Sequence, residues 1–237
     1  MDDLNLFDPK RPTAKRPLLG MTVLVVEDSR FACEALRLMC LRSGARIRRA
    51  DCLTAAARHL KVYRPSAVIV DIGLPDGPGE SLIADLAKAE PRVSILLGMS
   101  GDDHMRDRAM EAGADGFLAK PIVSLAAFQE TMMAAMPSDA LQLGPRIVSE
   151  EMVEPDISAY RDDISFVSEI LAERQDGPTL DYVAQFLTGV ARSAEDTQLI
   201  EAASLLSETP PGEGRRRAQA SHILNLVNER LQNQLAI

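Results

Sequence analysis

Between Gly20 and Met136 the sequence alternates short apolar runs with stretches of helical periodicity, and this alternation constrains the fold more than any other feature. Such alternation is typical of a parallel sheet covered by helices on both faces. The predicted strands are 21–26, 45–49, 67–70, 93–98 and 116–119, and the predicted helices are 30–41, 53–62, 80–89, 103–112 and 123–136. The first, third and fourth strands are almost wholly apolar, so we place them at the centre of a doubly wound, five-stranded α/β sheet.

Polar side chains stand at the ends of four of these strands. Glu27 and Asp28 end the first strand, Asp71 ends the third, Ser100 follows the fourth and Lys120 ends the fifth. In open parallel sheets the groups that perform chemistry gather at the carboxyl ends of the strands, where the strand order reverses. We therefore expect all five side chains to meet at one edge of the sheet.

Three carboxylates at one sheet edge repel one another, and burying them without a partner is costly. Mg²⁺ prefers carboxylate, water and phosphate oxygens in octahedral geometry, so it is the expected ion for Glu27, Asp28 and Asp71. Phosphoryl transfer needs an in-line nucleophile and positive charge on the equatorial oxygens. Asp71 is the candidate nucleophile, while Lys120 and the Ser100 hydroxyl would hold phosphoryl oxygens.

Four segments carry a resemblance to a known family. They are VLVVEDS (23–29), VDIGLPDGPG (70–79), Ser100-Gly101 and GADGFLAKP (113–121), and together they resemble the motif set of response-regulator receivers. The spacing of Asp71, Pro75 and Gly79 matches the family pattern, and Lys120 precedes a proline that is usually cis in the family. The resemblance implies a flavodoxin-like (βα)₅ receiver over residues 20–137.

The resemblance also implies a function. Asp71 would accept a phosphoryl group, with Mg²⁺, from a sensor histidine kinase or a phosphotransfer protein. Phosphorylation would draw Ser100 toward the phosphoryl group and let Phe117 move into the vacated space. The sequence departs from the commonest family pattern at Glu27 and Ser100, and Gly73 has no side chain to shield or orient a hydrolytic water.

Simpler interpretations stand beside these. Asp28 could only cap the next helix, Lys120 could be a solvated surface lysine, and Phe117 could serve packing alone. The Asp71 site could also belong to a haloacid-dehalogenase-like phosphatase, but that chemistry requires a second aspartate two residues later. Gly73 occupies that position.

The rest of the chain is predicted to be helical. Its helices are expected at about 157–171, 180–190, 193–206 and 215–235, and Ser193 with Asp196 predicts a capping box for the third. The resulting domains are an N-terminal arm (1–19), the receiver (20–137), a linker (138–155) and an α-helical effector or dimerisation domain (156–237). The apolar stripes of the helices indicate the core of a small bundle. The alternative is that the apolar face of a helix binds a partner protein or a second copy of the chain.

Charge limits the partners of the helical half. Residues 140–237 hold 8 Lys and Arg against 16 Asp and Glu, and such an acidic segment is repelled by phosphate backbones. We therefore expect DNA to be an unlikely partner and interpret 215–217 (RRR) as a solvated helix start. Contact with a protein target, or with a second copy of the chain, is the favoured output; a transcription regulator with an atypical helical DNA-binding output is the alternative.

Other classes of protein are disfavoured. Three cysteines without metal-ligand spacing suggest neither a disulfide framework nor a zinc site. No apolar run approaches the roughly 20 residues of a membrane helix, so a cytoplasmic location without membrane contact is expected. The three histidines lie in no phosphotransfer context, and no constellation for a separate enzymatic activity is recognised, so we expect that the chain is not an enzyme. An enzyme whose catalytic residues lie in the second half is the third hypothesis.

Overall fold

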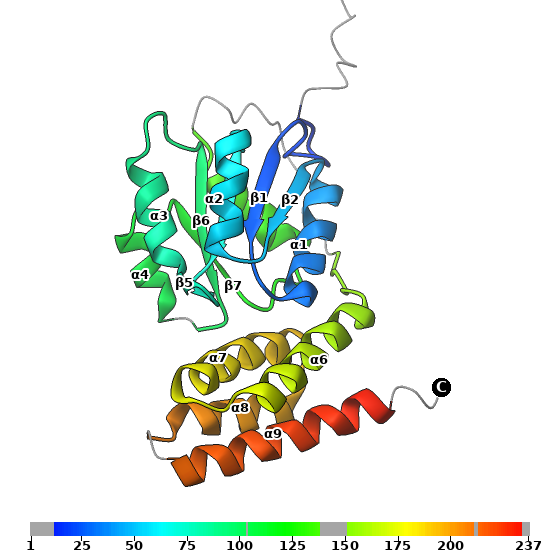
Figure 1. Ribbon diagram of the computed structural model, residues 1–237. Coiled ribbons are helices and arrows are strands. Elements are labelled where there is room, and N and C mark those ends of the chain that lie inside the picture. Colours follow the sequence, from blue (N-terminus) through cyan, green and yellow to red (C-terminus); the bar gives the residue numbers. More distant parts are fainter. Residues whose placement is uncertain (1–11, 103, 138–150, 211–212, 234–237) are drawn as a thin grey trace, which may run out of the picture.

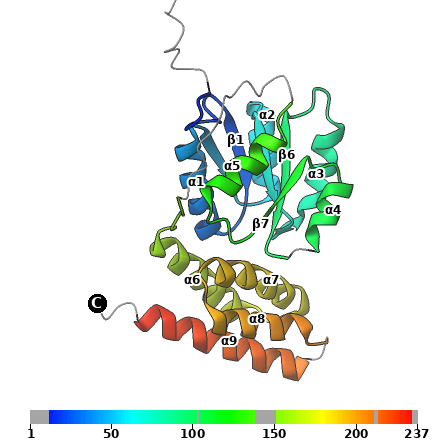
Figure 2. The ribbon, with the colours of Figure 1, turned by 180° about the vertical axis from the view of Figure 1, so that it is seen from behind.

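The computed structural model describes residues 12–102, 104–137, 151–210 and 213–233. Most of the predicted arm and linker, the middle of the turn after residue 209 and the end of the last predicted helix lie outside the described residues. The chain forms a sheet domain, from β1 to α5, and a helical domain, from α6 to α9. The helical domain lies at one end of the sheet domain (Figures 1 and 2).

Five strands form one parallel sheet in the order β2-β1-β3-β6-β7. They are β1 (Thr22–Val26), β2 (Arg46–Ala50), β3 (Ala67–Asp71), β6 (Ile95–Ser100) and β7 (Gly116–Ala119). The three most apolar strands are central, as predicted, because only central strands are buried on both faces. The strand order reverses between β1 and β3, and this places a crevice at their carboxyl ends.

Helices cover both faces of this sheet. They are α1 (Arg30–Ser43), α2 (Leu53–Val62), α3 (Gly79–Lys88), α4 (Met105–Glu111) and α5 (Leu125–Ala134). Alternate residues of β1 enter different cores: Val23 and Val25 pack with α1 and α5, while Leu24 and Val26 pack with α2, α3 and α4. The predicted doubly wound, flavodoxin-like α/β fold is confirmed.

A short hairpin that the sequence did not predict follows Asp71. Its strands, β4 (Gly73–Leu74) and β5 (Gly77–Pro78), pair antiparallel and are too short to give a sequence pattern. The next residue is Gly79, where an added Cβ would lie 1.9 Å from the carbonyl oxygen of Asp71. Glycine is therefore required there for the chain to fold back against the end of β3.

The helical domain consists of α6 (Ile157–Glu173), α7 (Gly177–Ser193), α8 (Thr197–Glu208) and α9 (Glu213–Asn233). Their apolar stripes form one core, which includes Ile164, Val167, Leu180, Leu187 and Val227. The prediction of an all-α second half with no strand is confirmed for the described residues between Ile157 and Asn233. None of the described helices has the length and apolar character needed to cross a membrane.

The predicted capping box at the start of α8 is wrong. Asp196 itself is the N-cap, and its carboxylate accepts a hydrogen bond from the amide of Leu199 at 3.1 Å. Ser193 instead ends α7, where its hydroxyl donates to the carbonyl of Gly189 at 2.9 Å. A serine inside a helix can satisfy its hydroxyl on the carbonyl four residues earlier, so Ser193 does not need to cap α8.

The arginine run at the start of α9 is only partly solvated. Arg215 and Arg217 are exposed, as expected, but Arg216 is buried and forms an ion pair with Asp181 of α7. The interpretation of the whole run as a solvated helix start is therefore wrong for Arg216. The Arg216 charge is paired within the helical domain and is not free to bind phosphate, which weakens the case for a nucleic-acid patch there.

Candidate phosphoryl-acceptor and metal site

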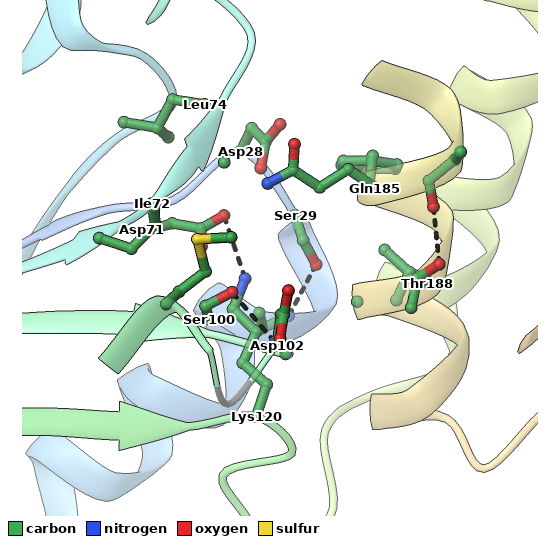
Figure 3. A pocket seen from close by; sticks show the side chains of 18 of the residues that line it. Asp28, Ser29, Asp71, Ile72, Leu74, Ser100, Asp102, Lys120, Gln185 and Thr188 are labelled. Atoms are coloured by element: carbon green, nitrogen blue, oxygen red, sulfur yellow. Dashed lines mark hydrogen bonds and ion pairs between the residues drawn. The ribbon is translucent and has the colours of Figure 1, made fainter. Parts of the chain in front are cut away.

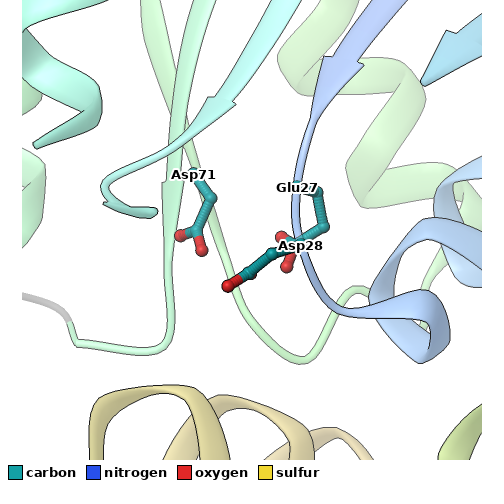
Figure 4. Close-up of side chains that lie close together, drawn as sticks. All are labelled: Glu27, Asp28 and Asp71. Carbon is teal, nitrogen blue, oxygen red and sulfur yellow. The ribbon is translucent and has the colours of Figure 1, made fainter. Parts of the chain in front are cut away.

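The three predicted carboxylates meet at the carboxyl edge of the sheet (Figure 4). Glu27 and Asp28 directly follow β1, and Asp71 is the last residue of β3, the neighbouring strand. One carboxylate oxygen from each residue lies within 4.8 Å of the others. Glu27 is fully buried and Asp71 is 6% exposed, so the cluster is largely removed from water.

Lys120 faces this cluster. Its Nζ lies 2.7 Å from Glu27 Oε2 and 3.2 Å from Asp71 Oδ2, and its side chain is buried. The peptide bond between Lys120 and Pro121 is cis, as the resemblance implied. The alternative of a solvated surface lysine is therefore excluded.

The charges of the cluster do not balance. Burial, with the charge of Asp71 next, raises the pKa of Asp28 to about 6. Burial also raises the pKa of Glu27, although Lys120 opposes this shift. Burial alone would lower the pKa of Lys120, but the Asp71 and Glu27 carboxylates outweigh it and raise that pKa. Three acidic groups against one lysine leave an excess of negative charge, and their oxygens are a donor set that suits Mg²⁺.

The two predicted switch residues lie on neighbouring strands. Ser100 ends β6, two residues later than the predicted strand end, and its Oγ accepts a hydrogen bond of 3.1 Å from the amide of Asp102. Phe117 on β7 is 5% exposed and packs in the core with α4, where the Arg106 guanidinium lies 5.5 Å from its ring centroid. Phe117 thus occupies an inward position next to the strand that ends in Ser100.

The site opens into a cleft between the sheet edge and α7 (Figure 3). The cleft has a volume of about 790 Å³. On the sheet side its wall includes Asp28, Asp71, Ser100 and Lys120, and on the side of the helical domain it includes Gln185, Thr188 and Arg192. The second half of the chain therefore forms part of the site.

Asp163 of α6 attaches the helical domain to the start of α1. Its carboxylate accepts hydrogen bonds from the Ser29 hydroxyl at 2.7 Å, the Arg30 amide at 2.8 Å and the Phe31 amide at 3.0 Å. These amides belong to the first turn of α1, where unpaired N–H groups and the helix dipole favour a negative charge. Burial raises the pKa of Asp163, and the three hydrogen bonds oppose that shift.

Further contacts join the helical domain to the sheet domain near the acceptor site. The Tyr182 hydroxyl of α7 donates a 2.8 Å hydrogen bond to Asp28 Oδ2, and Arg192 donates to the carbonyl of Gly101. Phe31 of α1 is buried in the core of the helical domain, with its ring centroid 5.9 Å from that of Tyr160. The two domains thus share polar contacts at the site and an apolar contact beside it.

The five polar side chains expected at one edge of the sheet do lie there, but the contribution of the second half of the chain was not predicted. One signal was present for Asp163. It lies three residues after Tyr160 and four before Val167, so it falls on the buried face of a predicted helix. An aspartate at such a position needs a hydrogen-bonding partner. No comparable signal marks Tyr182 or Gln185, which precede stripe positions rather than occupy them.

Comparison with known proteins identifies the sheet domain. Residues 23–131 match the family model described as the response regulator receiver domain. The chain is 33% identical over 99 residues to the KDP operon transcriptional regulatory protein KdpE of Escherichia coli, and 31% identical over 103 residues to the virulence transcriptional regulatory protein PhoP of Salmonella typhimurium. These matches cover 42% and 43% of this chain and 44% and 46% of the relatives, so the chain spans less than half the length of these curated relatives.

The matches to solved structures also cover less than half of this chain but most of the matched chain. A response regulator from Chloroflexus aurantiacus is 30% identical, with a TM-score of 0.41, and the match covers 43% of this chain and 85% of that one. The receiver domain of a sensor histidine kinase from Pseudomonas aeruginosa, described with a magnesium ion in its active-site cleft, is 24% identical, with a TM-score of 0.43 and coverage of 48% and 95%.

Proposed function

Residues 23–131 form a response-regulator receiver domain, and from this we propose that Asp71 accepts a phosphoryl group from a sensor histidine kinase or a phosphotransfer protein. One observation carries the proposal: the Asp71 carboxylate lies within 4.8 Å of two further carboxylates and 3.2 Å from the Lys120 amine. This arrangement supplies a nucleophile, a site for a divalent cation and a positive charge at one point.

Each residue has a role in this proposal. Glu27, Asp28 and Asp71 would hold Mg²⁺, which when bound would neutralise negative charge on the phosphoryl oxygens. Asp71 Oδ attacks the phosphorus of the donor's phosphohistidine, the bond from phosphorus to the imidazole nitrogen breaks, and the electron pair stays on that nitrogen. Lys120 binds a phosphoryl oxygen as a point charge, and the Ser100 hydroxyl donates to another. Ser100 and Phe117 would then change position as the switch.

The helical domain is the proposed output, and it acts by contact with a protein. Its docked position is tied to the acceptor site through Tyr182, which donates a hydrogen bond to Asp28, and through Asp163, which accepts from the Arg30 amide at the start of α1. A phosphoryl group and Mg²⁺ at the site would compete with Tyr182 for Asp28 and enter the cleft beneath α7. We infer that phosphorylation shifts the population away from the docked arrangement and exposes the helical domain to its target. A non-enzymatic role and a cytoplasmic location are part of this proposal.

The test is phosphorylation of the full chain by acetyl phosphate with Mg²⁺, followed by intact-protein mass spectrometry. The wild type should gain one phosphoryl group, and Asp71→Asn should gain none. Asp76→Asn is the matched control: Asp76 follows Asp71 by five residues, but its carboxylate accepts from the Leu53 and Thr54 amides at the start of α2. A phosphoryl group retained by Asp71→Asn would overturn the proposal.

Transcriptional regulation is the second candidate. KdpE and PhoP are both named as transcriptional regulatory proteins, so the comparisons do not support the expectation that DNA is an unlikely partner. A DNA-binding output would release counterions, and retention of the phosphorylated chain on DNA should then fall steeply with salt. Retention that depends on both phosphorylation and low salt would favour this candidate over a protein target.

A further inference from the structure

Gln185 of α7 fills a space that the receiver domain leaves empty. Gly73 lies two residues after Asp71 and has no side chain. An ideal Cβ on Gly73 would lie 1.9 Å from Gln185 Nε2 and 2.6 Å from Gln185 Cδ. The carboxamide of Gln185 therefore occupies the place beside Asp71 that a side chain at position 73 would take. Figure 3 shows it pointing from α7 into the cleft, toward Asp28 and Asp71.

The direction of approach is important for chemistry at phospho-Asp71. A water that attacks phosphorus in line must come from the side opposite the Asp71 oxygen. The carboxylates point out of the sheet edge, and α7 runs across the cleft on the side they face (Figures 3 and 4). Gln185 thus reaches the site from the side on which the attacking water must lie.

Other polar side chains of α7 at the cleft already form hydrogen bonds or ion pairs. The Thr188 hydroxyl donates to the Ala184 carbonyl at 2.7 Å, Arg192 donates to Gly101, and Asp181 pairs with Arg216. Tyr182 is bound to Asp28. The Gln185 carboxamide makes no hydrogen bond to any residue in the described part of the chain, so its carbonyl and its amide N–H groups can bind water.

We propose that Gln185 positions the water that hydrolyses phospho-Asp71, so that the docked helical domain shortens the lifetime of the phosphoryl group. This inference rests on the proposed function of Asp71. The water oxygen forms a bond to phosphorus, the bond from phosphorus to Asp71 Oδ breaks, and the electron pair returns to the Asp71 carboxylate. The proton of the water leaves on inorganic phosphate or passes to solvent, and Gln185 stays neutral throughout.

The contact between the two domains would then have a second role. Only the docked arrangement brings Gln185 to the cleft. Molecules whose helical domain has moved away keep the phosphoryl group, and molecules whose domain docks again lose it. The output domain would then set the duration of its own signal.

The experiment follows the decay of the phosphorylated full chain after the small phosphodonor has been removed, with Mg²⁺ present. Gln185→Ala should slow the decay about tenfold or more, the scale of losing a positioned reactant. Gln198→Ala is the matched control, because Gln198 lies on α8 and contacts Arg230; it should decay within twofold of wild type. Gln185→Asn, one methylene shorter, should fall between alanine and wild type.

A second variant separates positioning from a general structural effect. Gly73→Ala places a methyl group where Gln185 Nε2 lies, so it should displace the carboxamide and slow the decay as well. Because both changes remove the same group, the double variant should decay no more slowly than Gln185→Ala alone. The rate of phosphorylation should change less than twofold in Gln185→Ala, whereas a helix that merely blocked the cleft would make that rate rise.

The outcomes distinguish the two proposals. A wild-type chain that gains no phosphoryl group on Asp71 overturns the proposed function and this inference with it. A chain that is phosphorylated on Asp71, but whose Gln185→Ala variant decays at the wild-type rate or faster, overturns this inference alone.

Discussion

The Tyr182 hydroxyl of α7 donates a 2.8 Å hydrogen bond to Asp28, one of the three carboxylates that would hold Mg²⁺. A single carboxylate is therefore shared between the metal site and the helical domain. An ion that binds Asp28 in the receiver domain changes the strength of the hydrogen bond between Asp28 and Tyr182. By linkage, docking of the helical domain through Tyr182 changes the affinity for that ion by the same factor. This shared group links the chemistry at Asp71 to the position of the second half of the chain.

Tyr182→Phe tests this hydrogen bond. The ring keeps its contact with Phe186, whose centroid lies 5.7 Å away, so only the hydroxyl is lost. We expect the free energy of unfolding to fall by about 1 kcal/mol, measured by urea unfolding. Tyr63→Phe is the matched control, because the Tyr63 hydroxyl is buried without a hydrogen-bond partner among the described residues. Equal losses in the two variants would show that the bond to Asp28 contributes nothing.

Two neighbouring aspartates of α6 provide a second test. Asp163→Ala leaves the Ser29 hydroxyl and two amides of α1 without their acceptor, so the free energy of unfolding should fall by about 2 kcal/mol. Asp162→Ala removes only a solvent-exposed ion pair with Arg30 and should change it by less than about 0.5 kcal/mol. Small-angle scattering should show a larger radius of gyration for Asp163→Ala alone. An unchanged radius would contradict the role of Asp163 in docking.

The pKa of Asp28, about 6, predicts how Mg²⁺ binding depends on pH. Because this pKa is raised on folding, protonation of Asp28 as the pH falls through about 6 stabilises the metal-free protein. The protonated form binds Mg²⁺ poorly, so affinity should fall about tenfold for each unit of pH below that value. The increase in Tm caused by Mg²⁺ should be larger at about pH 7.5 than at about pH 5. Asp28→Asn should reduce that difference to the part that the raised pKa of Glu27 causes, and an equal increase in Tm at both pH values in the wild type would contradict the assignment.

The pKa of Asp196 predicts the opposite direction of pH dependence, for the stability of the helical domain. Burial alone would raise its pKa, but hydrogen bonds from Arg230, the Leu199 amide and Tyr160 outweigh this and lower it. The charged form therefore stabilises the fold at neutral pH, and this contribution is lost as the pH falls from about 4 through the lowered pKa. Asp196→Asn should lower the free energy of unfolding by about 2 kcal/mol at neutral pH, and by less in acid.

Asp176→Asn serves as the control for that variant. Asp176 caps α7 through the Thr179 amide, it is exposed to solvent, and asparagine caps a helix equally well. Its effect on the free energy of unfolding should be small at either pH. A pH dependence as large as that of Asp196→Asn would indicate a general effect of charge.

The receiver half could be predicted closely because its signals are local. Asp28, Asp71 and Lys120 lie at or just past the ends of apolar strands, so the strand pattern gives the position of each side chain at the edge of the sheet. Strand β6 was predicted to end two residues early, since Met99 and Ser100 lie past its most apolar stretch. The β4–β5 hairpin was missed because two residues per strand carry no periodicity.

The docking of the helical domain could not be predicted in the same way. It depends on contacts between segments more than 130 residues apart in the chain, such as Asp163 with Ser29 and Tyr182 with Asp28. Helical periodicity shows which face of a helix is buried, but not which distant segment covers the remaining face. Gln185 has no signal in its own sequence context, and only its position beside Gly73 indicates a role.

Amide hydrogen exchange at Arg30 and Phe31 tests most directly whether the acceptor site controls the helical domain. Both amides are held by Asp163 only in the docked arrangement. With Mg²⁺ and beryllofluoride, which mimics the phosphoryl group, exchange at both amides should become faster in the wild type and stay unchanged in Asp71→Asn. Exchange that is the same with and without beryllofluoride in a wild-type chain shown to bind it would contradict the account.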